Sequence, residues 1–330
     1  MTVLQEGGHI AEIFDKESGV SPLWIPPWPS IEPSTYSLAK NPEYGADDES
    51  KLLSGIMGHN LCLDNFGGPS TDEAAAGLGV HGEAPIASYD VEVKNGTLCM
   101  RAAFPIAAIK FERLVELQGR NIRFVSEVES LASIDRPIGW TEHVTLGPPF
   151  VQRGNTQIRS SATRSRVFEA DFGAASYLQP GAEFMWPMAP RKDRAQIDLR
   201  VFTNAEVSGA FTTHLMDTER KDAFFAVFSP AHNLMLGYVW RRADFPWMGI
   251  WEENRSRMLP PWNGKTTTWA LEFGVSPFPE TRRKMIDRHE LFGVPGYRWL
   301  PAKAKLTAEF WAITRSTNAI PESLSWPGLS

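Results

Sequence analysis

The stretch Asn121-Ile-Arg-Phe-Val-Ser-Glu-Val-Glu129 decides the fold class, because apolar and polar side chains alternate along it. Ile122, Phe124 and Val128 fall on one face of an extended chain, while an arginine and two glutamates fall on the other. An alternation with a period of two is typical of an antiparallel strand that packs one face on a core and turns the other to water. We therefore expect a half-buried strand here.

Similar runs lie on both sides of this stretch. Residues 86–94 and 97–104 flank an Asn95-Gly96 step, which is a strong signal for a tight β-hairpin turn. Further alternating runs occur at residues 109–117, 196–202, 223–228, 234–240, 266–273 and 305–313. The pattern predicts an all-β chain of antiparallel strands.

Helix signals are sparse. Residues 279–292, ended by Gly293, form the best candidate, and residues 71–79 make either a short helical turn or a loop. The clusters of Pro and Gly are short enough to be loops within one body. We predict a single domain over residues 1–330, closed as a sandwich or barrel because such closure protects the strand edges.

Charge and composition exclude several classes of partner. The chain has 33 Lys and Arg residues against 39 Asp and Glu residues, a formal net charge of −6. This balance provides no basic surface for nucleic acid or for an anionic membrane, and it suits a neutral or weakly polar small molecule. The sequence contains neither a signal-peptide pattern nor an apolar run of about 18 residues, so we expect a cytoplasmic protein. The oligomeric state is not indicated.

The first stretch that could carry chemistry is Gly139-Trp-Thr-Glu-His143-Val-Thr-Leu-Gly. On a strand, Thr141, His143 and Thr145 share one face, and Trp140 lies on the other. A histidine between two threonines faces a polar environment, as in the wall of a cleft. A histidine that only stabilises the structure is equally compatible with this spacing.

The second stretch is Trp247-Met-Gly-Ile-Trp-Glu252-Glu253-Asn254. Alternation places Glu252 and Asn254 on one face, and Glu253 on the other face with Trp251. The two adjacent carboxylates therefore point apart and are a poor acid/base pair with each other. A solvated pair of glutamates at a strand end remains the alternative.

The third stretch is glycine-rich and carries His81. Asn65-Phe-Gly-Gly-Pro is followed by Gly77-Leu-Gly-Val-His81-Gly, and glycine-rich backbone allows a ligand to approach closely. An ordinary surface loop is the alternative. The glycines do not form a nucleotide-binding pattern, and the seven histidines show no metal-ligand spacing, so we expect neither a metal nor a cofactor.

In their order along the chain, the three stretches resemble the aldose 1-epimerase (galactose mutarotase-like) superfamily, in its divergent branch. The likeness extends over roughly residues 7–320. The segments that carry it are Gly7–Ile13 with Leu23-Trp24, Gly79–Glu83, Val128–His143, Trp251–Asn254 and Pro261–Gly274.

The resemblance implies a β-supersandwich of antiparallel sheets with few short helices and a sugar cleft on one sheet. It implies that His143 is the general acid for the ring oxygen, that Glu252 is the base for the anomeric hydroxyl, and that His81 orients the substrate. The other residues expected to contact the sugar are Trp140, His214, Trp251 and Asn254.

The chain also departs from the family pattern. Glu142 stands where the family has Asn, and Thr-Leu-Gly follows His143 where the family has Tyr-Phe-Asn. The family's substrate-binding Asp and early Arg have no clear counterpart. Glu253 and Glu272 therefore stay open as other candidates for the base.

The leading hypothesis is a sugar isomerase of the aldose 1-epimerase type, in which paired proton transfers open and close the pyranose ring. A non-catalytic carbohydrate-binding protein on the same fold is the second. A glycoside hydrolase or polysaccharide lyase is the third, although hydrolysis would require two carboxylates flanking the sugar bond.

Overall fold

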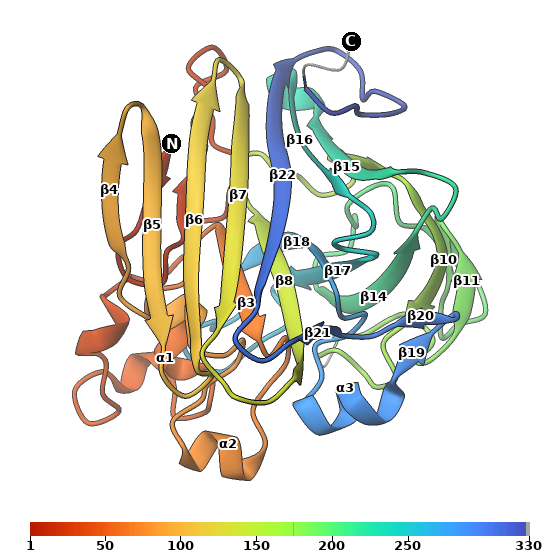
Figure 1. Cartoon of the computed structure of the whole chain (residues 1–330). Coiled ribbons are helices and arrows are strands. Elements are labelled where there is room, and N and C mark those ends of the chain that lie inside the picture. Colours follow the sequence, from red (N-terminus) through yellow and green to blue (C-terminus); the bar gives the residue numbers. More distant parts are fainter. Residues whose placement is uncertain (174, 328–330) are drawn as a thin grey trace.

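The computed structural model describes residues 1–173 and 175–327. In this part of the chain, two large antiparallel sheets pack face to face (Figure 1). The larger sheet has the spatial order β1 (Thr2–Val3), β2 (Ile10–Glu12), β3 (His59–Asp64), β8 (Arg136–Leu146), β18 (Thr267–Gly274), β17 (Trp247–Asn254), β14 (Ser208–Met216), β10 (Ala162–Val167) and β11 (Glu183–Met185), with β21 (Arg298–Leu300) paired to β8.

The second sheet contains the stretch that decided the fold class. Its order is β4 (Asp90–Lys94), β5 (Thr97–Phe104), β6 (Ile109–Gln118), β7 (Asn121–Ser130), β22 (Lys305–Ser316), β16 (Leu234–Arg241), β15 (Asp222–Ser229) and β9 (Gln157–Ser160). Along β7, buried and half-buried residues alternate without a break. The predicted all-β class and the antiparallel pairing are confirmed.

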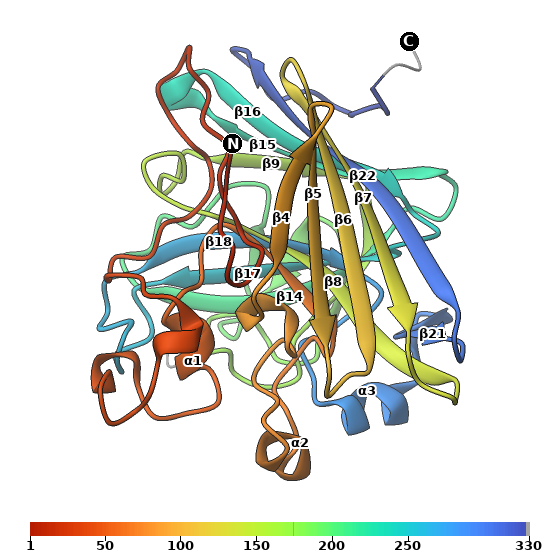
Figure 2. The same cartoon turned by 60° about the vertical axis from the view of Figure 1, so that its left-hand side comes forward.

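The apolar core lies between the two sheets. Figure 2 shows β14, β17 and β18 running across the direction of β4–β7, so that the inner faces meet in the middle of the molecule. Phe124 of β7 stacks on Phe310 of β22 with ring centroids 4.8 Å apart, and Trp240 of β16 stacks on Phe273 of β18 at 4.3 Å. These contacts fix which face of the larger sheet is buried and which is left to form a site.

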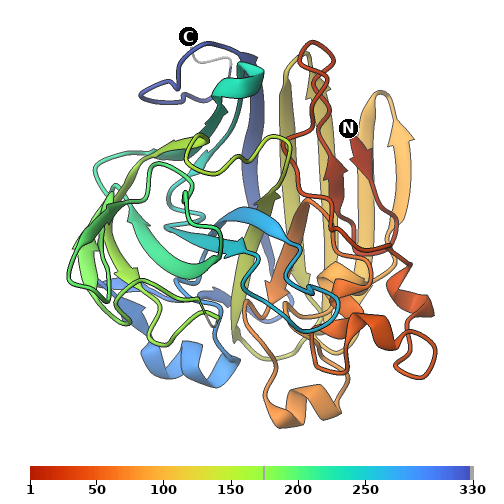
Figure 3. The same ribbon diagram turned by 180° about the vertical axis from the view of Figure 1, so that it is seen from behind.

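The remaining elements are short helices, short strands and 3-10 turns outside the two large sheets. Seen from behind, the red-to-orange N-terminal part and the green middle part of the chain flank the central strands (Figure 3). These elements are α1 (Ser50–Leu53), α2 (Thr71–Ala75), α3 (Arg282–Arg288), β12 (Met188–Pro190), β13 (Gln196–Asp198), β19 (Glu290–Leu291), β20 (Val294–Pro295) and the single 3-10 turns η1 (Pro33–Thr35), η2 (Pro42–Tyr44), η3 (Ala84–Ile86) and η4 (Pro230–His232).

The predicted helix at 279–292 is shorter than expected. α3 begins at Arg282 and ends at Arg288, because the next residue, His289, has a positive φ of 60° that stops the helix before Gly293. The predicted strand at 196–202 is also shortened, to β13. No helix in the described residues is both long and apolar enough to cross a membrane.

Candidate functional site

A cleft of about 400 Å³ opens on the face of the larger sheet that is turned away from the second sheet. Side chains of β8, β14, β17 and β18 contribute to it. Residues from the segments 49–56, 66–81, 168–173 and 257–262, together with Pro279, complete the lining. The cleft is thus assembled from segments far apart in the sequence, on strands held in register by the sheet.

His143 and Glu272 lie side by side in this cleft. β8 and β18 are neighbours, and their register sets the two residues directly opposite each other. The Nε2 atom of His143 is 3.0 Å from Oε1 of Glu272, and both side chains are almost fully buried. The Nδ1 atom of His143 is 2.9 Å from the Thr145 hydroxyl. With Nε2–H donating to the Glu272 carboxylate, Nδ1 accepts a hydrogen bond from the Thr145 hydroxyl in the neutral ring and donates one to it in the protonated ring.

His81 approaches His143 from the glycine-rich loop. The two imidazole rings are 5.4 Å apart, centroid to centroid. Since a carbonyl oxygen only accepts, Nδ1 of His81 donates to the Phe66 carbonyl at 2.6 Å, and the neutral ring offers Nε2 as an acceptor. Burial and the neighbouring His143 lower the pKa of His81, which keeps the ring neutral.

The loop that carries His81 is tied to the end of β3. His81 adopts a φ of 68°, and Gly82 follows with a φ of 78°, where a Cβ atom would lie 2.4 Å from the Leu63 carbonyl oxygen. Such a left-handed conformation is uncommon for residues other than glycine. The Leu63 amide donates to the His81 carbonyl at 3.3 Å. The loop is therefore held against the strand beneath it.

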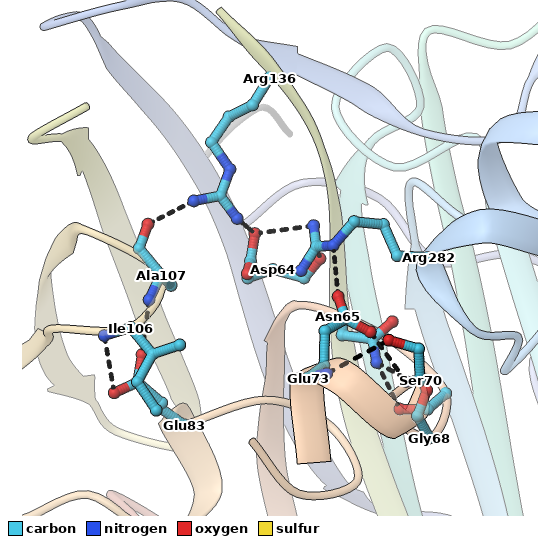
Figure 4. A network of polar contacts seen from close by, with 11 residues as sticks. Asp64, Asn65, Gly68, Ser70, Glu73, Glu83, Ile106, Ala107, Arg136 and Arg282 are labelled. Atoms are coloured by element: carbon cyan, nitrogen blue, oxygen red, sulfur yellow. Dashed lines mark hydrogen bonds and ion pairs between the residues drawn. The ribbon is translucent and has the colours of Figure 1, made fainter. Parts of the chain in front are cut away.

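A network of ion pairs anchors the same region from the outside (Figure 4). The Asp64 carboxylate at the end of β3 is shared by Arg136 and Arg282, and Arg282 is 2.7 Å from Asp64 Oδ2. Arg282 also reaches Glu73 of α2 at 2.7 Å. The side-chain amide of Asn65 donates to the carbonyls of Gly67 and Gly68, two residues of the cleft wall.

Two tryptophans and an arginine form another wall. Trp251 of β17 packs edge-on against His143, with ring centroids 5.9 Å apart, and against Trp262 at 6.0 Å. The guanidinium of Arg257 lies 4.8 Å from the Trp262 ring and donates to Glu49 at 2.9 Å. Aromatic rings in this position suit the apolar face of a sugar ring.

The structure does not bring Glu252 to this cleft. Alternation along β17 turns Trp251 toward His143 and Glu252 to the opposite face of the sheet. Glu252 lines a separate small cavity and accepts a hydrogen bond from the Tyr177 hydroxyl at 3.0 Å. Burial raises its pKa to about 7. The structure therefore does not place Glu252 and His143 on opposite sides of one ligand, as the resemblance led us to expect.

Three other expected contact residues also lie outside the cleft. Trp140 is fully buried between the sheets, where its Nε1–H donates to Glu142 at 3.2 Å. His214 contacts the hydroxyls of Ser165 and Thr212 at 2.8 and 2.9 Å. The side-chain amide of Asn254 donates to the Ala205 carbonyl at 2.8 Å. Each of these side chains has its polar atoms engaged by the protein itself.

Glu142, which replaces the expected Asn, belongs to a buried charged cluster beneath the site. Its carboxylate is 2.5 Å from Arg113 and 2.8 Å from His59, and all three side chains are buried between the sheets. Burial opposes ionisation of Glu142, but Arg113 and His59 outweigh it and hold the pKa below its usual value. The cluster joins β3, β6 and β8 under His143.

Sequence reasoning missed several cleft residues. Glu272 was only one of the alternatives for the base, and the charged residues Glu49, Asp171 and Arg257 gave no signal. Glu253 does not contribute to the cleft lining, because its carboxylate accepts the backbone amides of Ser256 and Arg257 and fixes that turn. No group of His, Cys, Asp and Glu in the described residues could hold a metal ion.

Comparisons with known proteins give similar folds at low sequence identity. A candidate aldose 1-epimerase from Klebsiella pneumoniae superposes with a TM-score of 0.63 at 12% identity, covering 95% of this chain and 76% of that one. A galactose mutarotase related enzyme from Lactobacillus acidophilus gives 0.60 at 14% identity, covering 97% and 95%. A galactose mutarotase-like protein from Clostridium acetobutylicum gives 0.59 at 13% identity, covering 96% and 92%.

By sequence, no protein-family model and no curated protein matches the chain. The likeness is therefore structural, and at these identities it concerns the fold alone. The chain has the antiparallel β-sandwich fold of the galactose mutarotase-like and aldose 1-epimerase proteins.

Proposed function

We propose that this protein binds a pyranose in the cleft over His143 and interconverts its anomers by acid/base ring opening. The observation that carries the proposal is the pairing of an imidazole and a carboxylate, Nε2 to Oε1 at 3.0 Å, in a cleft of about 400 Å³. The role of base passes from Glu252 to Glu272, since Glu272 is the glutamate that lines the cleft beside His143.

The chemistry requires two proton transfers that cancel. The base removes the proton of the anomeric hydroxyl, the acid protonates the ring oxygen, and the bond between C1 and the ring oxygen breaks to give the open aldehyde. Rotation about the C1–C2 bond and closure on the other face give the second anomer. The Glu272 carboxylate takes the first proton, and His143, protonated as the imidazolium, gives the second from Nε2. Their direct hydrogen bond lets the proton return from carboxylate to imidazole after the sugar has left.

The remaining cleft residues bind and orient the ring. His81 offers a neutral acceptor nitrogen for a sugar hydroxyl. Trp251 and Trp262 offer aromatic surface. Positioning a substrate between an acid and a base lowers the entropic part of the barrier, because the groups no longer have to meet by diffusion.

A non-catalytic sugar-binding protein is the second candidate. It is favoured by the fact that His143 and Glu272 already satisfy each other, so that a ligand must separate them before either can act. Glycoside hydrolysis is less compatible with the cleft. Among the described lining residues, the carboxylates other than Glu272 are Glu49 and Asp171, and both are paired with cations, Arg257 and Lys192.

The test is exchange spectroscopy by NMR on a panel of aldoses, with the purified chain and with His143→Ala. The proposal predicts that the wild-type chain accelerates exchange between α and β anomers of at least one aldose, and that His143→Ala loses this acceleration while its thermal unfolding stays cooperative. Binding without acceleration supports the second candidate instead.

A further inference from the structure

The lining of the cleft is largely apolar. One wall is formed by aromatic rings, with Phe172 and Phe168 lying 5.4 and 6.0 Å from Phe211 of β14. Another is formed by Leu52, Leu53 and Ile56 at the end of α1. The tryptophan wall faces the same space.

Most polar groups of the described cleft lining are engaged by the protein, and the exceptions include Nε2 of His81 and the indole Nε1–H of Trp251. His81 uses Nδ1 on the Phe66 carbonyl, and His143 uses its two nitrogens on Thr145 and Glu272. At the rim, Glu49 is 2.9 Å from Arg257. Asp171 is 2.7 Å from Lys192. A free hexose would bury several hydroxyls in this space, and a buried hydroxyl without a partner costs binding free energy.

The charges of the cleft also argue against an anionic sugar. The cations near it, Arg257 and Lys192, are already neutralised by Glu49 and Asp171, and Glu272 adds a carboxylate at the floor. A phosphate or carboxylate on the ligand would lie beside the Glu272 carboxylate, and no cation of the described lining is left unpaired to balance its charge. These charges favour a neutral ligand.

We infer that the cleft takes a neutral pyranose in which an apolar group replaces or covers at least one hydroxyl, such as a deoxy or O-alkyl sugar. This inference rests on the proposed function, which also fixes where the apolar group can be: ring opening needs a free anomeric hydroxyl, so the group is not at O1. The phenylalanine wall of Phe168, Phe172 and Phe211 provides the surface that would receive it.

The experiment compares D-glucose and D-galactose with their 6-deoxy and 6-O-methyl derivatives, and with glucose 6-phosphate. Anomer exchange is measured by NMR, and binding is measured in parallel by tryptophan fluorescence, since Trp251 and Trp262 line the cleft. We expect at least one deoxy or methyl derivative to exceed its parent in kcat/KM by roughly 5- to 100-fold, the factor for one buried hydroxyl without a partner. The phosphate should be the poorest ligand.

Parent hexoses that are equal to or better than all their derivatives would overturn the inference and leave the proposed function standing. Binding that prefers the derivatives, with no exchange of any sugar, would support the inference and contradict the proposed function. The absence of both exchange and binding would overturn both.

A wall variant provides an internal comparison. Phe172→Asn places a polar amide in the phenylalanine wall and should reduce the preference for the apolar derivative by about fourfold or more, the factor for one methylene group. Phe14→Asn, at a phenylalanine that is 47% exposed elsewhere on the surface, should leave the preference unchanged. Equal preferences in both variants would show that the phenylalanine wall does not select the ligand.

Discussion

His143 and Glu272 face each other across β8 and β18, with Nε2 of the imidazole 3.0 Å from Oε1 of the carboxylate. Each reaches this position through alternation on its own strand, and the antiparallel register brings the two strands to the same level. Glu252 lies on β17, the neighbour of β18, and its side chain points to the opposite face of the sheet, where it contacts Tyr177. Because side chains alternate along a strand, a shift of one residue is enough to move a carboxylate from the cleft face to the other face of the sheet.

His81 should affect binding more than turnover. In His81→Asn, the amide can still donate to the Phe66 carbonyl and asparagine tolerates the positive φ, but the acceptor at Nε2 is lost. We expect KM to rise by roughly 2- to 10-fold, the value of one hydrogen bond, with kcat within about threefold of wild type. A collapse of kcat with unchanged KM would instead place His81 at the reacting atoms.

Glu252 should make the protein less stable at alkaline pH than at acid pH. Its folded-state pKa of about 7 lies above the ordinary value near 4.5, so the native state holds a proton that the unfolded state releases. The free energy of unfolding should therefore fall as pH rises from about 4.5 to about 7, by on the order of 3 kcal/mol.

Glu252→Gln resembles the protonated side chain and should remove this part of the slope. Urea unfolding at pH 5 and pH 8 measures it, with the exposed Glu290→Gln as the control. Equal slopes in wild type and Glu252→Gln would show that Glu252 is ionised in the folded protein.

The buried cluster of Glu142, Arg113 and His59 should stabilise the fold only while its charges are paired. Glu142→Leu leaves the Arg113 charge buried without a partner and should cost about 3–5 kcal/mol of stability. The double variant Glu142→Leu with Arg113→Met should recover much of that loss. If the double variant is as unstable as the sum of its single variants, the two charges do not compensate each other.

The same cluster predicts an acid limit. Because the folded-state pKa of Glu142 is depressed, its contribution to stability is complete above the unfolded-state pKa and is lost as pH falls through the folded-state value. Wild type should therefore lose stability on acidification more steeply than the double variant does, as measured by urea unfolding at pH 3 to 6.

Arg282 should hold α2 and the loops on both sides of it in place. Arg282→Met removes the ion pairs to Asp64 and Glu73, while Arg136 still contacts Asp64. We expect a stability loss of about 1–3 kcal/mol and faster proteolytic cleavage between residues 65 and 82. Arg283→Met, whose ion pair with Asp287 is exposed, is the matched control and should have little effect.

Much of the fold could be predicted from the sequence, because strand alternation is a local property. The stretch 121–129 became β7 with the predicted faces, and the Asn95-Gly96 step became the turn between β4 and β5. The faces of β8 and β17 were also predicted correctly within each strand. The helix predicted at 279–292 was too long, since the positive φ of His289 ends it after Arg288.

The assembly of the site could not be predicted in the same way. Whether His143 shares a face with Glu252 or with Glu272 depends on the register between strands that are more than 100 residues apart in the chain, and no local pattern reports it. Trp140 and Glu252 were chosen for their nearness in sequence or a loose motif, and both point away from the cleft. The loop residues Glu49 and Arg257 meet only through the folded chain.

Whether Glu272 or Glu252 acts as the base is tested most directly by comparing anomer exchange in wild type, Glu272→Gln and Glu252→Gln by NMR under identical conditions. We expect Glu272→Gln to lose about 100-fold or more of the enzymatic rate, because a positioned acid/base group is removed, while Glu252→Gln stays within a few fold of wild type. A collapse of exchange in Glu252→Gln with nearly normal exchange in Glu272→Gln would contradict this expectation.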